Sequence, residues 1–379
     1  AFLSGGIDSS TTAALMVAAG KGRVRTFSIG FPDLGFDESK HAAAVARHLG
    51  TQHEQLVVSA ADALAVVPQL PDIYDEPFAD SSQIPTCLVS NLTRRHVTVA
   101  LSGDGGDELF GGYNRYAFAE KMAARVLSLP RAARGAVAAL IKTIPERAVD
   151  RFADLLPGRM RPAQPGDKLR KLAEILPYDT QELYLRLVSQ CSQPELLANG
   201  AAEHARGRGA YDASPSTGGL LEWMQALDTT TYLPDDILQK VDRASMNCAL
   251  EVRPPLLDHR VVSFAFGLPR RLRVRDGETK WLLRRVLQRY VPRALFERPK
   301  MGFGVPLADW LRGPLRPWAE DLLDPVQLGG GYVNIDAARR MWKDHISGRR
   351  NMAYALWTIL MFEAWRRRWA IAPAMCRVS

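Results

Sequence analysis

The first residues able to do chemistry form the run Ser4-Gly5-Gly6-Ile7-Asp8-Ser9-Ser10. The run follows a short apolar segment and precedes an apolar, helix-like pattern from Thr11 to Ala19, so we expect a strand, a glycine turn and a helix. Backbone N–H groups at such a turn, the helix N-terminus and the serine hydroxyls all suit phosphate oxygens. Asp8 suits them only if a hard cation such as Mg²⁺ lies between its carboxylate and the phosphates. The alternative is a tight turn without a ligand.

A second loop, Ser102-Gly103-Asp104-Gly105-Gly106-Asp107-Glu108, combines three glycines with three acids directly after the apolar run Val97–Leu101. In a plain surface loop these acids would only cap a helix. Like charges gathered at the end of an apolar strand are destabilising unless a cation or a positive substrate group compensates them. The sequence therefore predicts that Asp8 and Asp107 hold Mg²⁺ on the phosphates. Asp104 and Glu108 are then left to act on a substrate amine or on an intermediate.

Strand and helix patterns alternate through the first hundred residues, and this rhythm predicts an α/β fold with a doubly wound parallel sheet. Ligands bind at the carboxyl ends of the strands in such sheets. The expected strands cover residues 24–29, 55–58 and 97–101, and the expected helices cover residues 37–49, 60–67 and 84–92.

Three segments are expected within one domain that covers residues 1–379. Residues 1–121 form the predicted nucleotide-binding α/β core. Residues 122–219 are rich in Ala, Leu and Arg with proline breakers, which indicates a helical insertion. Residues 220–379 form an additional, mostly helical C-terminal part.

Composition excludes several classes of function. The net charge is +8, but no aromatic residues interleave with the basic ones as nucleic-acid binding would require, so the excess suits at most an anionic substrate. No apolar run is long enough to span a membrane. The cysteines are far apart, show no metal-binding spacing and favour a reducing compartment, so we expect a cytoplasmic protein; they are Cys87, Cys191, Cys248 and Cys376.

The two loops together, S-G-G-I-D-S and S-G-D-G-G-D-E-L-F-G-G-Y, resemble the synthetase domain of the glutamine-dependent asparagine synthetases. The resemblance extends over nearly the whole chain. Its further motifs are Asp75-Glu76-Pro77, Tyr232–Leu238, Lys240–Met246, Glu251–Arg260 and Arg298–Gly304. This family implies ATP-dependent formation of β-aspartyl-AMP from aspartate, followed by attack of ammonia to give asparagine, AMP and pyrophosphate. The family also implies Mg²⁺ as a cofactor, and a homodimer is left open.

The resemblance assigns roles to individual residues. Asp104 stands at the family's acid for the aspartyl-AMP step, and Arg243 would hold a phosphate or the substrate carboxylate. Lys300 matches a loop lysine that neutralises the α-phosphate, although it could also be a solvated surface lysine. Asp8 and Asp107 would bind Mg²⁺-pyrophosphate. Leu3 and Ile29 would line the adenine and ribose pocket, and the remaining ATP contacts would come from Ser4, Gly5, Gly6, Asp8, Ser9, Ser102 and Gly103.

Two departures from the family pattern keep alternatives open. The family carries a glutaminase with an N-terminal cysteine upstream, whereas this sequence opens on Ala1 within an expected strand, so we expect that domain to precede it. The stretch Pro254-Pro255-Leu256-Leu257 also differs from the usual R-V-P-F-L-D. The acceptor could therefore be another carboxylate, as in lactam-forming relatives, although the acid at Asp104 favours asparagine. A catalytically silent nucleotide-binding module is the alternative from another class.

Overall fold

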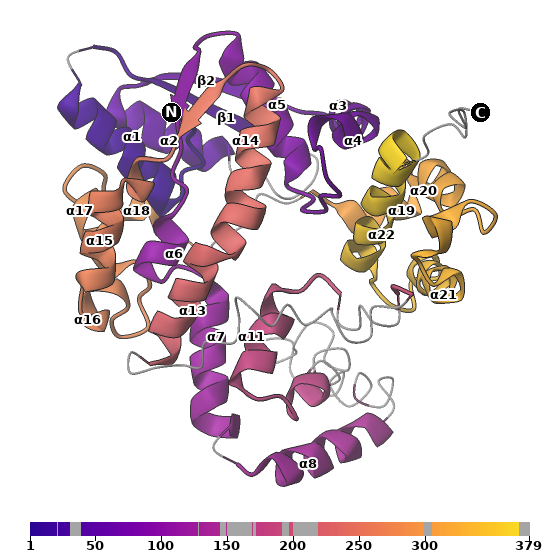
Figure 1. Ribbon diagram of the computed structural model, residues 1–379. Helices are drawn as coiled ribbons and strands as arrows, with labels where there is room; N and C mark the ends of the chain where they lie inside the picture. Colours follow the sequence, from indigo (N-terminus) through magenta and orange to yellow (C-terminus); the bar gives the residue numbers. More distant parts are fainter. Residues whose placement is uncertain are drawn as a thin grey trace, which may run out of the picture. The chain divides into compact units, whose positions relative to one another are not determined.

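The structure, a computed structural model, describes residues 1–20, 22–30, 39–127, 129–144, 149, 169, 172–191, 197–199, 219–298 and 305–370 (Figure 1). Two compact units emerge from its internal contacts. Unit 1 comprises residues 1–112, 193–207 and 228–379, and unit 2 comprises residues 113–192 and 208–227. The predicted division of the domain into three segments stays a prediction.

Short parallel strands run through unit 1. Strand β1 (Arg25–Gly30) pairs in parallel with β2 (Gln52–Val57), and β3 (Val99–Leu101) pairs in parallel with β4 (Glu251–Arg253). This arrangement confirms an α/β fold with parallel strands, in which helices predominate. Sequence patterns did not predict β4, because three residues are too few to show an alternation.

The first three residues lie between these two strand pairs. The Phe27 amide donates to the Ala1 carbonyl over 2.9 Å, and the Leu3 amide donates to the Phe27 carbonyl over 2.8 Å. On the other side, the Phe2 amide donates to the Leu101 carbonyl over 2.9 Å. The loops that follow Leu3 and Leu101 therefore leave neighbouring strand ends at the same edge. The doubly wound order of the whole sheet stays a prediction.

Apolar side chains of this region divide between two hydrophobic clusters. Leu3 packs with Ala13 and Ala14 of α1 (Ile7–Ala19) and with Val45 of α2 (Ser39–Leu49). Ile29 belongs to a separate cluster with α3 (Ala60–Val66), α5 (Gln83–Arg94) and the C-terminal helices. Leu3 is 2% exposed and Ile29 is 5% exposed, so both strands present buried side chains to helices.

The helices of unit 1 fall in three groups along the chain. The first group is α1 (Ile7–Ala19), α2 (Ser39–Leu49), α3 (Ala60–Val66), α4 (Leu70–Ile73), α5 (Gln83–Arg94) and α6 (Gly106–Phe110), with a 3₁₀ turn at Val67–Gln69. The second is a π-helical turn at Leu233–Leu238, α14 (Gln239–Met246), a 3₁₀ turn at Pro255–Leu257, α15 (His259–Gly267), α16 (Arg270–Arg273), α17 (Trp281–Leu287) and α18 (Arg293–Phe296). The third is α19 (Leu307–Arg312), α20 (Arg316–Leu322), a 3₁₀ turn at Leu328–Gly331, α21 (Ile335–Ile346), α22 (Ala353–Trp365) and a π-helical turn at Arg366–Ala370.

Local signals in the sequence explain where several of these helices begin and how they pack. Ser59 accepts a hydrogen bond from the Asp62 amide while Asp62 bonds back to Ser59, which is a capping box at the start of α3. The predicted helix after Ser59 is thereby confirmed. Trp357 of α22 is fully buried, and its ring centroid lies 5.9 Å from that of Trp318, so it serves packing. Among the described helices, none combines the length and the apolar composition needed to cross a bilayer.

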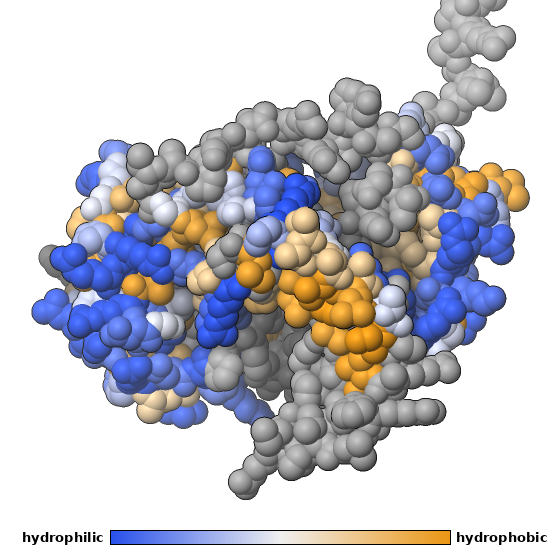
Figure 2. All heavy atoms as spheres, turned by 90° about the horizontal axis from the view of Figure 1, so that it is seen from below, coloured by the Kyte–Doolittle hydropathy of each residue, from blue (hydrophilic) through white to orange (hydrophobic). Residues whose placement is uncertain are grey.

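Unit 2 is helical, with α7 (Asn114–Met122), a π-helical turn at Ala123–Leu127, α8 (Arg131–Thr143) and α11 (Thr180–Val188), and α13 (Leu220–Thr230) begins in it. Its Arg134 is buried and donates from Nη1 to the carbonyls of Leu176 and Tyr178, over 2.8 and 2.5 Å. Figure 2 shows apolar surface over α8, whose exposed large side chains are Val137 and Leu140.

Candidate active site

The two glycine-rich loops meet at Gly103 and Gly106, where the second loop carries no side chain and so leaves room for Asp8 and Ser9 of the first. A Cβ atom on Gly103 would lie 2.6 Å from the Ser9 amide nitrogen, and one on Gly106 would lie 2.3 Å from Asp8 Oδ1. Only glycine allows two backbones to approach so closely. The Ser102 loop therefore packs directly on the first turn of α1, as the sequence predicted from the strand ends.

Hydrogen bonds order the first loop. Ser9 Oγ accepts from the Ser4 amide over 3.2 Å and lies 3.0 Å from Ser4 Oγ. Helix α1 begins at Ile7, directly after Gly6, so its partially positive N-terminus faces this loop. From the other side, Arg298 Nη2 donates to the Ser4 carbonyl over 3.1 Å. Two hydroxyls, a helix start and a guanidinium thus gather around one turn, which suits an anionic ligand.

The carboxylates of Asp8 and Asp107 converge on one ammonium group. Lys280 Nζ forms an ion pair with Asp8 Oδ2 and another, at 2.8 Å, with Asp107 Oδ1. Lys280 is only 4% exposed. Burial works to lower the pKa of Lys280, but the charges of Asp107 and Asp8 outweigh it and raise that pKa. The lysine is therefore charged between the two acids.

Asp104 has a different environment from its neighbour Asp107. Burial raises the pKa of the Asp104 carboxyl, and the charges of Asp8 and Asp107 add to that increase. Ser102 and Lys240 act in the opposite direction without reversing it. A carboxyl that holds its proton more tightly than usual, beside the carboxyl groups of Asp8 and Asp107, is typical of a group with an acid–base role.

A second buried lysine, Lys240 of α14, faces Asp104. Its Nζ lies 2.6 Å from Asp80 Oδ2, and both side chains are largely buried. Burial works to raise the pKa of Asp80, but Lys240 and hydrogen bonds from Ser82 outweigh it and lower the pKa. The Tyr74 hydroxyl donates to the Lys240 carbonyl over 3.1 Å and helps to fix this turn of α14.

The other predicted residues lie in various places. Arg243 pairs with Asp75 at 2.9 Å, and both side chains are substantially exposed. Leu3 and Ile29 contribute their side chains to the two hydrophobic clusters. Lys300 lies outside the described residues. The roles predicted for all of these residues stay predictions.

Glu251 and Arg253, at the start of the quoted motif Glu251–Arg260, form an ion pair of 2.6 Å. Sequence reasoning missed Lys240, Lys280 and Arg298 as site residues. Lys240 and Arg298 lie in motifs quoted above, but nothing in the pattern set them apart from their basic neighbours. Lys280 follows the Asp276-Gly277 turn and showed no signal at all.

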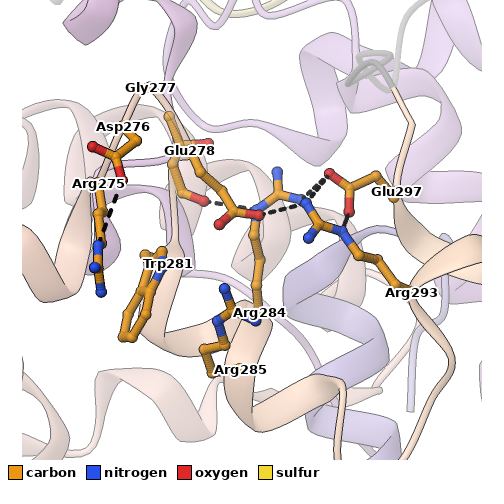
Figure 3. Close-up of a pocket in the computed structure, with 10 residues that line it drawn as sticks. Arg275, Asp276, Gly277, Glu278, Trp281, Arg284, Arg285, Arg293 and Glu297 are labelled. Atoms are coloured by element: carbon orange, nitrogen blue, oxygen red, sulfur yellow. Dashed lines mark hydrogen bonds and ion pairs between the residues drawn. The ribbon is translucent and has the colours of Figure 1, made fainter.

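A pocket of about 610 Å³ lies beside the turn that carries Lys280 (Figure 3). None of the predicted site residues lines it. Its charged side chains largely neutralise one another, since Arg293 pairs with both Glu278, at 2.8 Å, and Glu297. Arg275 and Arg285 lie over the Trp281 ring at 5.2 and 5.1 Å. We interpret this surface as a support for the turn rather than as the active site.

The donor set suits Mg²⁺ that arrives with phosphates. In the part of the chain that the structure describes, no three His, Cys, Asp or Glu side chains are grouped as a metal site. Mg²⁺ in nucleotide sites is nevertheless commonly held by one or two carboxylates together with substrate phosphates. The carboxylates of Asp8 and Asp107 both contact the Lys280 ammonium group, next to the loop that carries Ser4 and Ser9. They therefore provide two carboxylate ligands at one place.

Comparisons with known proteins support the same conclusion. The family model described as asparagine synthase matches residues 1–367. A Mycobacterium tuberculosis protein named "Putative asparagine synthetase (glutamine-hydrolyzing)" is 36% identical over 372 residues, which is 96% of this chain and 54% of that protein. A Bacillus subtilis protein named "Asparagine synthetase (glutamine-hydrolyzing) 1" is 31% identical over 368 residues, covering 96% of this chain and 55% of that protein. The chain spans about half the length of these curated relatives, and it belongs to the asparagine synthase family.

Proposed function

We propose that the chain is the synthetase part of a cytoplasmic, glutamine-dependent asparagine synthetase, a ligase of amino-acid biosynthesis. In this reaction a β-carboxylate oxygen of aspartate attacks the α-phosphorus of ATP, and pyrophosphate leaves. Ammonia then attacks the β-aspartyl-AMP carbonyl, AMP leaves and asparagine forms. The observation that carries the proposal is the contact between the two glycine-rich loops, which brings Asp8, Asp104 and Asp107 to one place.

The first loop would hold the ATP phosphates. The Ser4 and Ser9 hydroxyls, the Gly5 and Gly6 amides and the start of α1 together offer donors to phosphate oxygens. Asp8 and Asp107 would hold Mg²⁺, which when bound supplies positive charge for the leaving pyrophosphate. Ser102 and Gly103 of the second loop would add further ATP contacts.

The buried cations address the main difficulty of the first step, which joins two anions. Lys240 lies near Asp104 and is fixed by Asp80, so it can attract the substrate carboxylate toward the α-phosphate. Arg243 and Lys300 keep their predicted roles with the substrate and with the α-phosphate. Cations held in place before reaction reduce the barrier without reorganisation.

Asp104, which the resemblance assigns to the aspartyl-AMP step, would act on that intermediate when ammonia attacks it. Its raised pKa makes it a better proton acceptor than an ordinary aspartate. When ammonia adds to the acyl carbonyl, a proton on nitrogen must be removed, and a carboxylate of higher pKa removes it more readily. Asp104 would take that proton, and the amide and AMP would separate.

Glutamine is the proposed source of ammonia, because the relatives carry the words glutamine-hydrolyzing in their names and are about twice as long as the matched region. A glutaminase domain upstream of this region would supply the ammonia. The region itself would accept free ammonium in a direct assay.

The experiment measures pyrophosphate release from ATP, Mg²⁺ and ammonium, with and without L-aspartate, and identifies asparagine by mass spectrometry. We expect release that depends on aspartate and a product with the mass of asparagine. Asp104→Asn should form pyrophosphate but little asparagine. Release that ignores aspartate and responds to another carboxylate would replace the proposed acceptor. ATP binding without any release would point to the silent nucleotide-binding module.

A further inference from the structure

The Lys280 ammonium group lies between the carboxylates of Asp8 and Asp107. The two carboxylates would hold a divalent cation at this same place. Lys280 Nζ contacts Asp8 of α1 and Asp107 of α6, and these acids are 99 residues apart in sequence, so no local rule of helix or turn explains the pairing. Two carboxylates and one ammonium carry a single net negative charge. Without the ammonium, the same acids would carry two negative charges in a mostly buried place.

The backbone that presents Lys280 is held in an uncommon conformation. Lys280 has φ 54° and ψ 35°, in the left-handed region, directly before α17. A residue with a side chain is destabilised in that region, so the surroundings must enforce the conformation. The Lys280 amide donates to the Phe110 carbonyl over 3.1 Å, which ties it to the end of α6 next to Asp107.

The neighbouring turn is braced as well (Figure 3). Arg275 and Glu278 exchange backbone hydrogen bonds of 3.0 and 2.8 Å, and Arg284 Nε donates to the Thr279 carbonyl over 2.7 Å. Arg293 of α18 pairs with Glu278 at 2.8 Å. These contacts fix the turn that precedes Lys280, so its ammonium group has a defined position in the site.

Space around the ammonium is limited too. A Cβ atom on Gly112 would lie 1.9 Å from Lys280 Cε and 2.2 Å from Asp107 Oδ1. The lysine side chain therefore fills the place beside Asp107 that a larger residue at position 112 would take.

We propose that Lys280 is a resident cation of the phosphate site, which keeps free Mg²⁺ from binding to Asp8 and Asp107 and admits the metal only together with a polyphosphate. Phosphate oxygens add the negative charge and the ligands that the acids lack while Lys280 shares them. The proposal rests on the proposed function, because that function supplies the polyphosphate. Lys280 acts as a positioning residue: it sets the order in which ligands enter.

The test compares the purified protein with the Lys280→Met variant, which keeps the length of the side chain and removes its charge. Mg²⁺ binding is measured by calorimetry without nucleotide, and then with inorganic pyrophosphate. We expect the apparent Mg²⁺ affinity without pyrophosphate to be at least about tenfold higher in Lys280→Met, because more negative charge faces the metal. Wild-type protein should bind Mg²⁺ tightly only once pyrophosphate is present.

Thermal unfolding gives a second measurement. Lys280→Met should melt at a lower temperature than wild type, and Mg²⁺ at about ten times its dissociation constant should raise that temperature by about 2 °C. Arg366→Met is the matched control, because it removes one cation from the buried Glu363 at a place with a single carboxylate. It should lower the melting temperature without any response to Mg²⁺.

If Lys280→Met does not fold, the double variant Asp8→Asn, Lys280→Met removes one of the facing charges and should fold, with only weak Mg²⁺ binding. Equal Mg²⁺ affinity in wild type and Lys280→Met would overturn the proposal, and so would wild-type binding that pyrophosphate does not strengthen. These measurements require no turnover. A failed aspartate assay would therefore refute the proposed reaction while leaving the role of Lys280 to be judged separately.

Discussion

Two buried ionic clusters of unit 1 are built in opposite ways. At the strand ends, Lys280 and the acids Asp8 and Asp107 come from distant parts of the chain. In the C-terminal helices, Glu363 is fully buried and pairs with Arg366 at 2.7 Å and Arg367 at 2.9 Å, three and four residues further on. The Gly329 amide also donates to Glu363 over 2.8 Å.

The difference indicates what each cluster is for. Glu363 has its partners supplied mostly by one helical turn, so the cluster forms as the helix forms and has no reason to rearrange. The strand-end cluster combines two acids, a lysine and the raised-pKa carboxyl of Asp104, and it needs glycines to let the backbones approach. Loss of the Glu363 cluster should affect stability, and loss of the strand-end cluster should affect turnover.

The largest expected effect is on turnover. Asp107→Ala should reduce pyrophosphate release about 1,000-fold, because it removes a carboxylate proposed to hold the metal on the leaving group. Release is measured with saturating aspartate and ammonium. The free energy of unfolding should change little, since Lys280 keeps Asp8 as a partner. Pyrophosphate release at the wild-type rate would rule out the metal role of Asp107.

Glu363→Ala should show the reverse pattern. The variant leaves two guanidinium groups and a backbone amide without their carboxylate, so we expect the free energy of unfolding to fall by about 3 kcal/mol. Urea denaturation measures this loss. Under conditions where the variant stays folded, pyrophosphate release should remain within about twofold of wild type.

The matched control is Glu320→Ala, which removes a similar pair with Arg316 at 2.8 Å whose side chains are about half exposed. It should lower the free energy of unfolding by no more than about 0.5 kcal/mol, because water already solvates both charges. Equal losses in the two variants would mean that burial does not set the strength of the Glu363 cluster.

The same contrast explains how much the sequence could predict. Glycine spacing and the strand ends predicted that the Ser4 and Ser102 loops meet, and the structure confirms their contact through Gly103 and Gly106. The local pattern also predicted the helix that begins at Ala60. The glycine runs, the strand ends and the helix start are each set by residues adjacent in sequence, so a single chain reveals them.

Long-range pairing could not be predicted in this way. The motif from Lys240 to Met246 drew attention to Arg243, but α14 buries Lys240, Ala244 and Ser245. The spacing of Ala244 and Ser245 from Lys240 could have indicated that Lys240 faces inward. Lys280 depends on a left-handed residue after a turn and on acids far away in sequence, for which no local pattern exists.

A smaller effect on turnover is expected from Gly112→Ala. The added methyl group would collide with Lys280 Cε and Asp107 Oδ1, and the flexible end of the lysine would move. We expect pyrophosphate release to fall about tenfold with a loss of about 1 kcal/mol in stability. Gly267→Ala is the control, because no atom lies within 4 Å of the new methyl group. An equal fall in both variants would show that displacement of Lys280 is not the cause of the loss.

The smallest expected effect is a pH dependence in the C-terminal helices. His345 is fully buried, and burial together with the nearby Arg312 lowers its pKa below 6.5, while the Ala308 carbonyl and Asp309 oppose this weakly. Its Nδ1 accepts from the Met352 amide over 3.3 Å, which requires the neutral ring. A depressed folded-state pKa gives stability that is present above the unfolded pKa and is lost as the pH falls through the folded value.

His345→Gln removes this titration while keeping an oxygen that can accept from the Met352 amide. Between pH 7.5 and pH 5.5, wild type should lose more of its free energy of unfolding than His345→Gln, by up to about 1 kcal/mol. Urea denaturation at the two pH values measures the difference. Because Asp104 has a raised pKa, it contributes in the opposite direction, and its contribution is lost as the pH rises through its folded value. A variant that loses as much stability as wild type would show that His345 does not set the pH sensitivity.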